Sequence, residues 1–379
     1  MTAATVVYSI SARLGGGGIG YIAYNAVAAI HQAGLLKRVF VSSNASDLPI
    51  SLVRQWGFTG RALKRLAAKD RRELIYYLES VLFDLWVTVQ LPDGGIFHGW
   101  NAMSLHTLRR AKKRGMITVV ERASSHPVTQ HQLIRDEYAH WGIPLKLPSR
   151  AYRRAVHELE EADYVAIPSP FVRQSMIDAG VPEDRLLEIQ FGVDLSRFQP
   201  SPTSPPHSLR AIFAGQVSVR KGVPYLLEAW QRLGWTNAEL WIVGAITPDF
   251  ASLQHRWGNL AGVRIIDHST QLAQLFQQCD VFVFPSIEEG SALVTYEAMA
   301  CGLPIITTPN AGSVARDGVD GYVVPIRDVD ALCDRLERLR GDAALRRRMG
   351  RSARQRAEQF AWTQYQSVLI TSYRRLTGE

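Results

Sequence analysis

The stretch of the 379-residue sequence that decides the fold reads Phe284-Pro285-Ser286-Ile287-Glu288-Glu289-Gly290-Ser291-Ala292-Leu293-Val294-Thr295-Tyr296-Glu297-Ala298-Met299-Ala300-Cys301-Gly302-Leu303-Pro304. The apolar run Val281–Phe284 predicts a buried strand that stops at Pro285. A helix is expected from near Ser291, and Gly302 and Pro304 are typical stop signals for it. A strand, a short loop and a helix in this order are typical of one unit of a parallel α/β sheet.

Two carboxylates stand at opposite ends of this segment, Glu289 in the loop and Glu297 in the helix. A rise of about 1.5 Å per helical residue lets the two side chains hold groups roughly 10 Å apart. The free N–H groups at the helix start lie between them and favour an anion. A phosphate flanked by hydroxyl-bearing rings fits this arrangement. The alternative is a plain loop acid and a solvated helix acid.

Alternating strands and helices extend in both directions from this segment. Expected strands before it lie at residues 5–10, 38–42, 95–98, 117–120 and 164–168, with a helix over 21–36. Further expected strands lie at residues 211–213, 239–243, 263–266, 281–285, 304–307 and 321–324. This alternation predicts an α/β protein with doubly wound parallel sheets.

A proline-rich stretch divides the two series of strands. Residues 199–207 contain four prolines, which exclude a helix or a central strand. We therefore expect an N-terminal Rossmann-like domain over 1–199, a linker over 200–207 and a C-terminal Rossmann-like domain over 208–355. Residues 356–379 are expected to form a helix that returns to the N-terminal domain. Ligands of open parallel sheets bind at the carboxyl ends of strands, so the two domains should enclose a cleft.

A basic pair, Arg220 and Lys221, follows the first strand of the C-terminal series. Gly215 and Gly222 bracket the loop that carries it. Two cations at the carboxyl end of a strand suit the charge on a leaving diphosphate. The alternative is a solvated pair of surface residues.

Together these segments resemble the retaining glycosyltransferases of the GT-B fold, family 4. The resemblance is carried by the Glu289-x7-Glu297 spacing and by the stretches 157–189, 192–200 ("GVDLSRFQP"), 215–222 ("GQVSVRKG") and 290–306. It implies two Rossmann-like domains that face each other across a cleft. It also implies transfer of a sugar from a nucleotide-diphosphate donor to a hydroxyl acceptor, with front-face departure and retention.

The resemblance assigns roles to the charged residues. Glu289 is expected to contact hydroxyls of the donor sugar, Glu297 to hold the nucleoside ribose, and Arg220 and Lys221 to bind the diphosphate. The other donor-binding residues expected in this domain are Gly215, Gly290, Ser291, Ala292 and Leu293. The sequence departs from the family at Gln216, where an arginine is common, and Arg220 is expected to replace it.

A glycine cluster near the N-terminus permits two interpretations. Gly15, Gly17 and Gly20 match a dinucleotide-binding pattern, but the following strand, Phe40–Asn44, lacks the acid that such enzymes use. The family resemblance instead implies that this loop approaches the donor from across the cleft, with Gly17 and Gly18 in closest contact. A plain flexible turn is the remaining alternative.

One N-terminal residue is expected beside the donor sugar, because similar enzymes place a histidine there. His126 is the first candidate and is predicted to be catalytic. His98, Glu121 and Arg122 are the alternatives. Either histidine could instead be a structural residue whose hydrogen bonds are satisfied.

No metal or cofactor site is predicted. The D-x-D sequence at Asp328–Asp330 opens an expected helix and is interpreted as its cap. Cys279, Cys301 and Cys333 lack metal or redox spacing and are expected to be reduced thiols. The nucleotide-diphosphate sugar is expected as the co-substrate. No metal ion is expected, because the two cations and the helix N-terminus can neutralise the charge of its diphosphate.

The charge is mildly basic, because 43 Lys and Arg oppose 35 Asp and Glu. No apolar run reaches the roughly 18 residues of a membrane span, and no signal peptide is evident, so a cytoplasmic location is expected. Residues 61–86 join a basic start to an apolar helix face. This helix either rests peripherally on the inner face of a membrane or packs on the core with a solvated basic rim. Nucleic acid is not expected as a partner, because no aromatic stacking platform accompanies the cations.

Two other functions share this pattern. A nucleotide-sugar epimerase of the same fold would act on the donor alone, and a nucleotide-sugar-binding scaffold would lack turnover. The presence of both glutamates and both cations favours the transferase.

Overall fold

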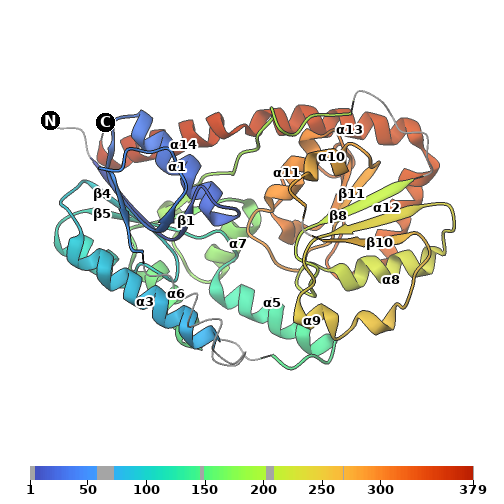
Figure 1. Ribbon diagram of the computed structural model, residues 1–379, viewed down its shortest axis with the longest axis horizontal. Coiled ribbons are helices and arrows are strands. Elements are labelled where there is room, and N and C mark those ends of the chain that lie inside the picture. The colour runs from blue at the N-terminus through green and yellow to red at the C-terminus, as the bar shows by residue number, and fades with distance from the viewer. Residues whose placement is uncertain (1–4, 58–71, 146–148, 202–208, 268, 379) are drawn as a thin grey trace.

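The computed structural model describes residues 5–57, 72–145, 149–201, 209–267 and 269–378. These residues form two α/β domains, each built on a parallel sheet (Figure 1). The strand order is β3-β2-β1-β4-β5-β6-β7 in the first sheet and β10-β9-β8-β11-β12-β13 in the second. The α/β class predicted from the alternation is therefore confirmed.

The N-terminal sheet contains the strands β1 (Val6–Leu14), β2 (Leu36–Asn44), β3 (Val53–Gln55), β4 (Ile96–Trp100), β5 (Ile117–Glu121), β6 (Tyr164–Ile167) and β7 (Leu186–Glu188). Its helices are α1 (Ile19–Gln32), α3 (Arg72–Gln90), α4 (Leu105–Lys113), α5 (Pro127–His140), α6 (Ser149–Glu161) and α7 (Pro170–Asp178). The central strands are buried on both faces, as helix-covered parallel sheets require.

The C-terminal sheet contains the strands β8 (Arg210–Ala214), β9 (Glu239–Val243), β10 (Val263–Ile266), β11 (Val281–Phe284), β12 (Ile305–Thr307) and β13 (Gly321–Val323). The helices that follow the linker are α8 (Val223–Leu233), α9 (Pro248–Ala251), α10 (Leu272–Phe276), α11 (Leu293–Ala300), α12 (Val329–Gly341), α13 (Ala343–Ala357) and α14 (Trp362–Thr377). All four residues of β11 are buried, and this strand ends at Pro285 as predicted.

Helix α14 leaves the C-terminal domain and packs on the N-terminal one, beside α1 (Figure 1). One face of α14 joins the core beneath β1 and β4 through Trp362, Tyr365, Leu369 and Tyr373. The hydroxyl of Tyr373 lies 2.6 Å from Nδ1 of His98. Most of the predicted linker, residues 202–207, lies outside the described residues.

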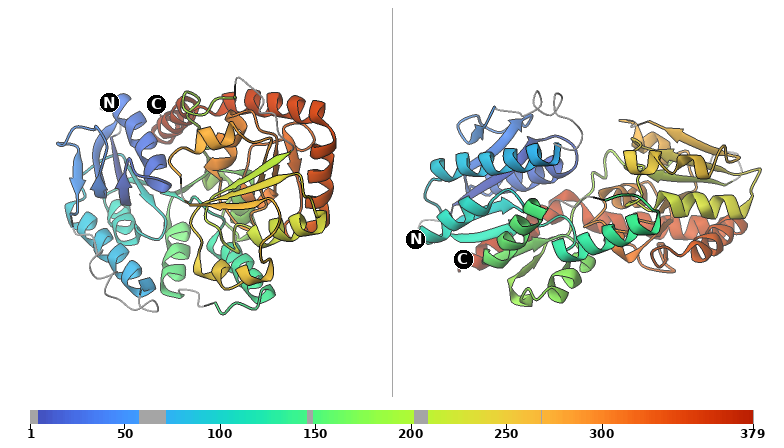
Figure 2. Two further views of the ribbon diagram at one scale, coloured as in Figure 1. Left: turned by 45° about the vertical axis from the view of Figure 1, so that its right-hand side comes forward. Right: turned by 90° about the horizontal axis from the view of Figure 1, so that it is seen from below.

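Helix α5 crosses between the domains in the other direction, which the sequence analysis did not predict. It belongs to the N-terminal domain by chain order, yet Trp141 at its end is buried in the core of the C-terminal domain. The ring centres of Trp141 and Tyr225 are 5.4 Å apart. Figure 2 shows α5 reaching from one domain to the other. Each domain therefore contributes a helix to its neighbour.

None of the helices in the described ranges is long and apolar enough to cross a membrane.

Candidate active site

A cleft of about 560 Å³ opens between the two domains at the carboxyl ends of β8 and β11. From the N-terminal domain it is lined by Gly18, Ile19, Ile22, Ala123 and Phe191. From the C-terminal domain it is lined by residues of four loops and of α11, including Gly215, Gln216, Arg220, Lys221, Glu289, Ser291, Ala292, Leu293 and Glu297. The edge at which parallel sheets bind ligands is therefore the edge at which the predicted donor residues gather.

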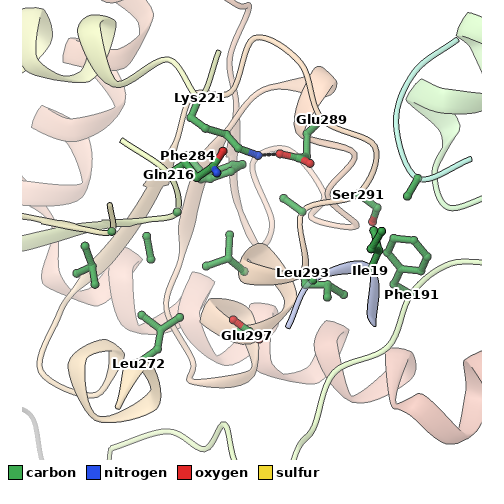
Figure 3. Close-up of a pocket in the computed structure, with 18 of the residues that line it drawn as sticks. Ile19, Phe191, Gln216, Lys221, Leu272, Phe284, Glu289, Ser291, Leu293 and Glu297 are labelled. Carbon is green, nitrogen blue, oxygen red and sulfur yellow. Dashed lines mark ion pairs between the residues drawn. The ribbon is translucent and has the colours of Figure 1, made fainter. Parts of the chain in front are cut away.

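Lys221 and Glu289 form an ion pair in this cleft, between Nζ and Oε2 (Figure 3). Lys221 is only 8% exposed, and its ammonium lies 5.2 Å from the ring centre of Phe284. Burial, together with the neighbouring Arg220, lowers the pKa of Lys221 well below its ordinary value. The ion pair with Glu289 and the charge of Glu288 oppose this shift and favour the ammonium form, and a cation in so dry a place interacts strongly with any anion that enters.

A glycine sets the position of this lysine. Gly222 has a φ of 71°, and a Cβ added there would lie 1.9 Å from the carbonyl oxygen of Pro285. Only a residue without a side chain lets the loop after β8 approach the end of β11 so closely. This contact brings Lys221 to Glu289 across two loops that are 68 residues apart in the chain.

Arg220 also lines the cleft, but its hydrogen bonds go to the acidic loop. Its Nη1 donates to the carbonyl oxygen of Glu288 at 2.9 Å. The same nitrogen lies 3.3 Å from Oε2 of Glu288 and 3.5 Å from Oε2 of Glu289. Gln216 lies on the same side of the cleft as Lys221 (Figure 3). Because Gln216 stands where the family commonly has an arginine, the cations of this loop that line the cleft are Lys221 and Arg220.

Glu297 lines the cleft at a second place, on α11. Figure 3 shows it beyond Leu293, apart from the Lys221–Glu289 pair. Glu297 is half-buried, and burial raises its pKa to about 7, with Arg197 opposing the shift. The two glutamates therefore lie at separate places in the cleft.

Protonation of Glu297 should control nucleotide binding. If the carboxylate accepts hydrogen bonds from ribose hydroxyls, the affinity for a free nucleotide diphosphate should fall as the pH falls through about 7, because the charged form is lost. Glu297→Gln should bind more weakly at pH 8 and lose most of this pH dependence. Calorimetric titration with UDP and GDP between pH 6 and 8 measures both effects. A variant with wild-type affinity and slope would contradict the ribose assignment.

The remaining predicted donor contacts divide into two groups. Gly215, Ser291, Ala292 and Leu293 line the cleft, and so does Gly18 from the other domain. Gly17 lines an adjoining cavity of about 520 Å³ that shares Gly18 and Glu297 with the cleft. Gly290 is not among the described residues that line the cleft, and a Cβ added there would lie 1.8 Å from the carbonyl oxygen of Ala123. Helix α11 begins at Leu293, two residues later than predicted.

His126 occupies a capping position and is not among the described residues that line the cleft. Its buried ring caps α5, and Nδ1 accepts a hydrogen bond from the amide of Val128 at 3.3 Å. Burial, helped by Arg122, lowers the pKa of His126 to about 4. From this loop, Ala123 lines the cleft. Alanine has no polar or titratable group, so its sequence position does not indicate a binding site.

The three alternatives to His126 are also held away from the cleft. His98 and Glu121 form a buried hydrogen bond of 3.1 Å within the N-terminal core. Arg122 donates to the carbonyl oxygen of Ser125 at 2.7 Å and to Oδ1 of Asn101 at 3.0 Å. These contacts support the structural interpretation that the sequence left open for the histidines.

In the part of the chain that the structure describes, no group of three or more His, Cys, Asp and Glu side chains could hold a metal ion. The D-x-D sequence caps a helix, because Oδ1 of Asp328 accepts from the amide of Ala331 at 2.8 Å. Cys279 and Cys301 are buried free thiols, and Cys333 is half-buried and free.

Comparison with known families identifies the domain that carries most of the cleft. Residues 208–342 match the family model described as glycosyl transferases group 1. This domain belongs to that family. The resemblance drawn from the two glutamates and the basic loop is therefore confirmed for the group 1 glycosyltransferase domain.

Curated relatives match the chain over part of its length. Over 217 residues the chain is 33% identical to a D-inositol 3-phosphate glycosyltransferase from Paenarthrobacter aurescens, covering 52% of this chain and 53% of that protein. Over 268 residues it is 29% identical to an MMP alpha-(1->4)-mannosyltransferase from Mycolicibacterium hassiacum, covering 66% and 64%. The matches thus span roughly half to two thirds of these relatives' lengths.

Solved structures match the whole chain. The sucrose-phosphate synthase from Thermosynechococcus elongatus has a TM-score of 0.72 at 19% identity and covers 99% of both chains. HepE from Anabaena, solved in complex with UDP-glucose, has a TM-score of 0.70 at 16% identity and covers 97% of this chain and 99% of its own. At these identities the likeness establishes the fold, and the predicted GT-B arrangement around the group 1 glycosyltransferase domain is confirmed.

Proposed function

We propose that this protein transfers a sugar from a nucleotide-diphosphate donor to a hydroxyl acceptor in glycan, glycolipid or glycoconjugate synthesis. The observation that carries the proposal is the ion pair between the buried Lys221 and the half-buried Glu289, which lies in the same cleft as Glu297. The transferase activities for which the curated relatives are named support it, and so does the complex of HepE with UDP-glucose. Retention and independence of metal ions are part of the proposal.

Each group in the cleft has a task in this reaction. The donor diphosphate binds beside Lys221 and Arg220, facing the N–H groups at the start of α11. Breaking the sugar–phosphate bond puts negative charge on the diphosphate, and preorganised cations stabilise that charge without reorganising. Glu289 contacts the sugar, and Glu297 holds the ribose. No catalytic role is proposed for His126.

Product analysis tests the proposal against its two alternatives. The protein is incubated with UDP-, GDP- and ADP-sugars and a panel of saccharide, lipid-linked and small-molecule acceptors, with and without EDTA. A glycosylated acceptor, formed equally in EDTA, is the expected product, and its anomeric configuration reports retention. An epimerised donor would favour the epimerase, and an unchanged donor that still binds would favour the scaffold.

A second proposal concerns the exposed face of α3, which we assign to peripheral membrane contact. Of the large hydrophobic residues that are exposed in the described ranges, half lie on this helix: Leu74, Tyr76, Leu78, Leu82, Leu85 and Val89. The opposite face packs into the core through Phe83 and Val87. The core-packing alternative therefore accounts for only one of the two apolar faces. The basic start predicted before this helix, residues 61–71, lies outside the described residues.

Negative charge introduced on the exposed face of α3 should release the protein from lipid. We expect Leu78→Glu/Leu82→Glu to reduce co-sedimentation with vesicles of anionic phosphatidylglycerol at least tenfold, because burying each carboxylate opposes the apolar contact. The control is Ile265→Glu/Val319→Glu, which places the same two charges on exposed sites of the other domain. Equal binding of both variants would contradict the proposal.

A further inference from the structure

Three consecutive residues of the acidic loop after β11, Glu288, Glu289 and Gly290, do not all face the cleft. Glu289 points into the cleft toward Lys221. Its two neighbours, Glu288 and Gly290, contact the N-terminal domain instead. The side chain of Glu288 is fully buried although it carries a charge. Buried charges need partners, and those of Glu288 come from both domains.

Most of the partners of Glu288 belong to the N-terminal domain. Its Oε1 accepts from the hydroxyl of Ser125 at 2.8 Å and from the amide of the same residue at 3.2 Å. Its Oε2 accepts from Nε2 of Gln130 on α5 at 3.2 Å. Arg220 supplies the contact from the C-terminal side. Burial opposes ionisation, but Arg220 and these hydrogen bonds lower the pKa of Glu288, so the group stays charged.

The residue on the other side of Glu289 is held just as closely. The hydroxyl of Ser169, at the start of α7, donates to the carbonyl oxygen of Gly290 at 2.6 Å. The Cα of Gly290 packs against the carbonyl of Ala123 with no room for a side chain. Glu289, the predicted catalytic residue, therefore lies between two residues that both contact the N-terminal domain.

We infer that Glu288 is a positioning residue that joins the closed arrangement of the two domains to the orientation of Glu289. This inference rests on the proposed function, in which Glu289 contacts the donor sugar. When the domains separate, Glu288 loses Ser125 and Gln130, and the loop loses the support that directs Glu289 at the sugar. Turnover then requires a closed cleft, whereas nucleotide binding through Lys221 and Glu297 does not.

Two substitutions test the contact from its two sides. Glu288→Gln keeps the shape but removes the charge, and Ser125→Ala removes the hydroxyl while leaving Arg220 and Glu288 together. We expect kcat to fall about tenfold to a hundredfold for Glu288→Gln, the scale for hydrogen bonds to charged groups, and about threefold to tenfold for Ser125→Ala, the scale for one ordinary hydrogen bond. The affinity for free nucleotide diphosphate should stay within twofold. The double variant should lose less than the product of the two single effects, because both substitutions act on one contact.

The chain offers a matched control in a second buried acid that joins the domains. Glu137 on α5 is fully buried and accepts from Nε of Arg327, in the C-terminal domain, at 2.7 Å. It does not belong to the loop that carries Glu289. Glu137→Gln should therefore leave kcat within threefold. An equal loss in Glu137→Gln and Glu288→Gln would mean that any weakened domain contact acts alike, and would overturn the inference.

A measurement that needs no turnover separates this inference from the proposed function. Hydrogen exchange of the amides of Ser125 and Ile287 should become faster in Glu288→Gln, since these amides bond within the loop contact. It should stay unchanged in Glu137→Gln. If the wild-type protein transfers no sugar but the exchange result holds, the proposed function fails and the contact stands. Unchanged exchange in Glu288→Gln would overturn the inference in either case.

Discussion

Lys221→Ala should lower kcat by about 10²–10³, the scale for removing one preorganised charge donor from a site shielded from water. The ammonium is 8% exposed and sits at the carboxyl end of the first strand of its domain, so it meets the diphosphate with little competing water. Negative charge grows on the diphosphate as the bond breaks, and the transition state therefore loses more than the ground state. KM for the donor should change less than kcat in steady-state assays.

Two controls accompany this variant. Arg232→Ala removes a half-exposed cation from α8 in the same domain, and its kcat should be unchanged. Arg220→Ala tests whether Arg220 has replaced the arginine that Gln216 lacks, in which case the loss should be comparable to that of Lys221→Ala. A loss under tenfold for Arg220→Ala would limit this residue to holding the acidic loop. Near-normal kcat in Lys221→Ala would contradict the diphosphate assignment itself.

Glu289→Ala should show the second large effect, a kcat lower by about 10² with the affinity for free nucleotide diphosphate retained. Its carboxylate contacts the sugar in the proposed reaction, and the ribose is held by Glu297 at a separate place. The substitution also removes the partner of Lys221, so Glu289→Gln is measured beside it to keep a hydrogen-bond acceptor there. Steady-state kinetics and calorimetry together give both quantities.

The pattern expected for Glu289 is the reverse of that expected for Glu297, which makes the pair informative. Glu289→Ala should lower kcat and retain the affinity for free nucleotide diphosphate, whereas Glu297→Gln should lower that affinity. If both variants lost nucleotide binding equally, the division of the cleft into a sugar end and a ribose end would be wrong.

Much of the fold could be predicted because its strands are short apolar runs bounded by glycine and proline. β9 and β10 agree with the predicted limits. The edge strands β3 and β7 were missed, since each has three residues of which one is buried. An edge strand is defined by its neighbour's hydrogen bonds, and three residues carry too little pattern to reveal it.

The charged half of the site was accessible from the sequence, whereas the half supplied by the N-terminal domain was not. Glu289, Lys221 and Glu297 lie on segments whose residue types carry chemistry. Ala123 and Phe191 form the opposite wall without any such signal. Glu288 was visible only as a neighbour of Glu289, because its partner Ser125 lies 163 positions away and tertiary packing alone brings them together.

Helix α14 has a consequence for how the protein is made. The N-terminal core is completed by Trp362, Tyr365, Leu369 and Tyr373, so its apolar surface beside α1 stays uncovered until the ribosome has translated those codons. At about 5–20 residues per second, the first domain waits many seconds for its own last helix. The N-terminal domain therefore reaches its complete core only after the C-terminal domain has been synthesised. Its order of synthesis differs from its order of completion, because the segment made first is finished by the segment made last.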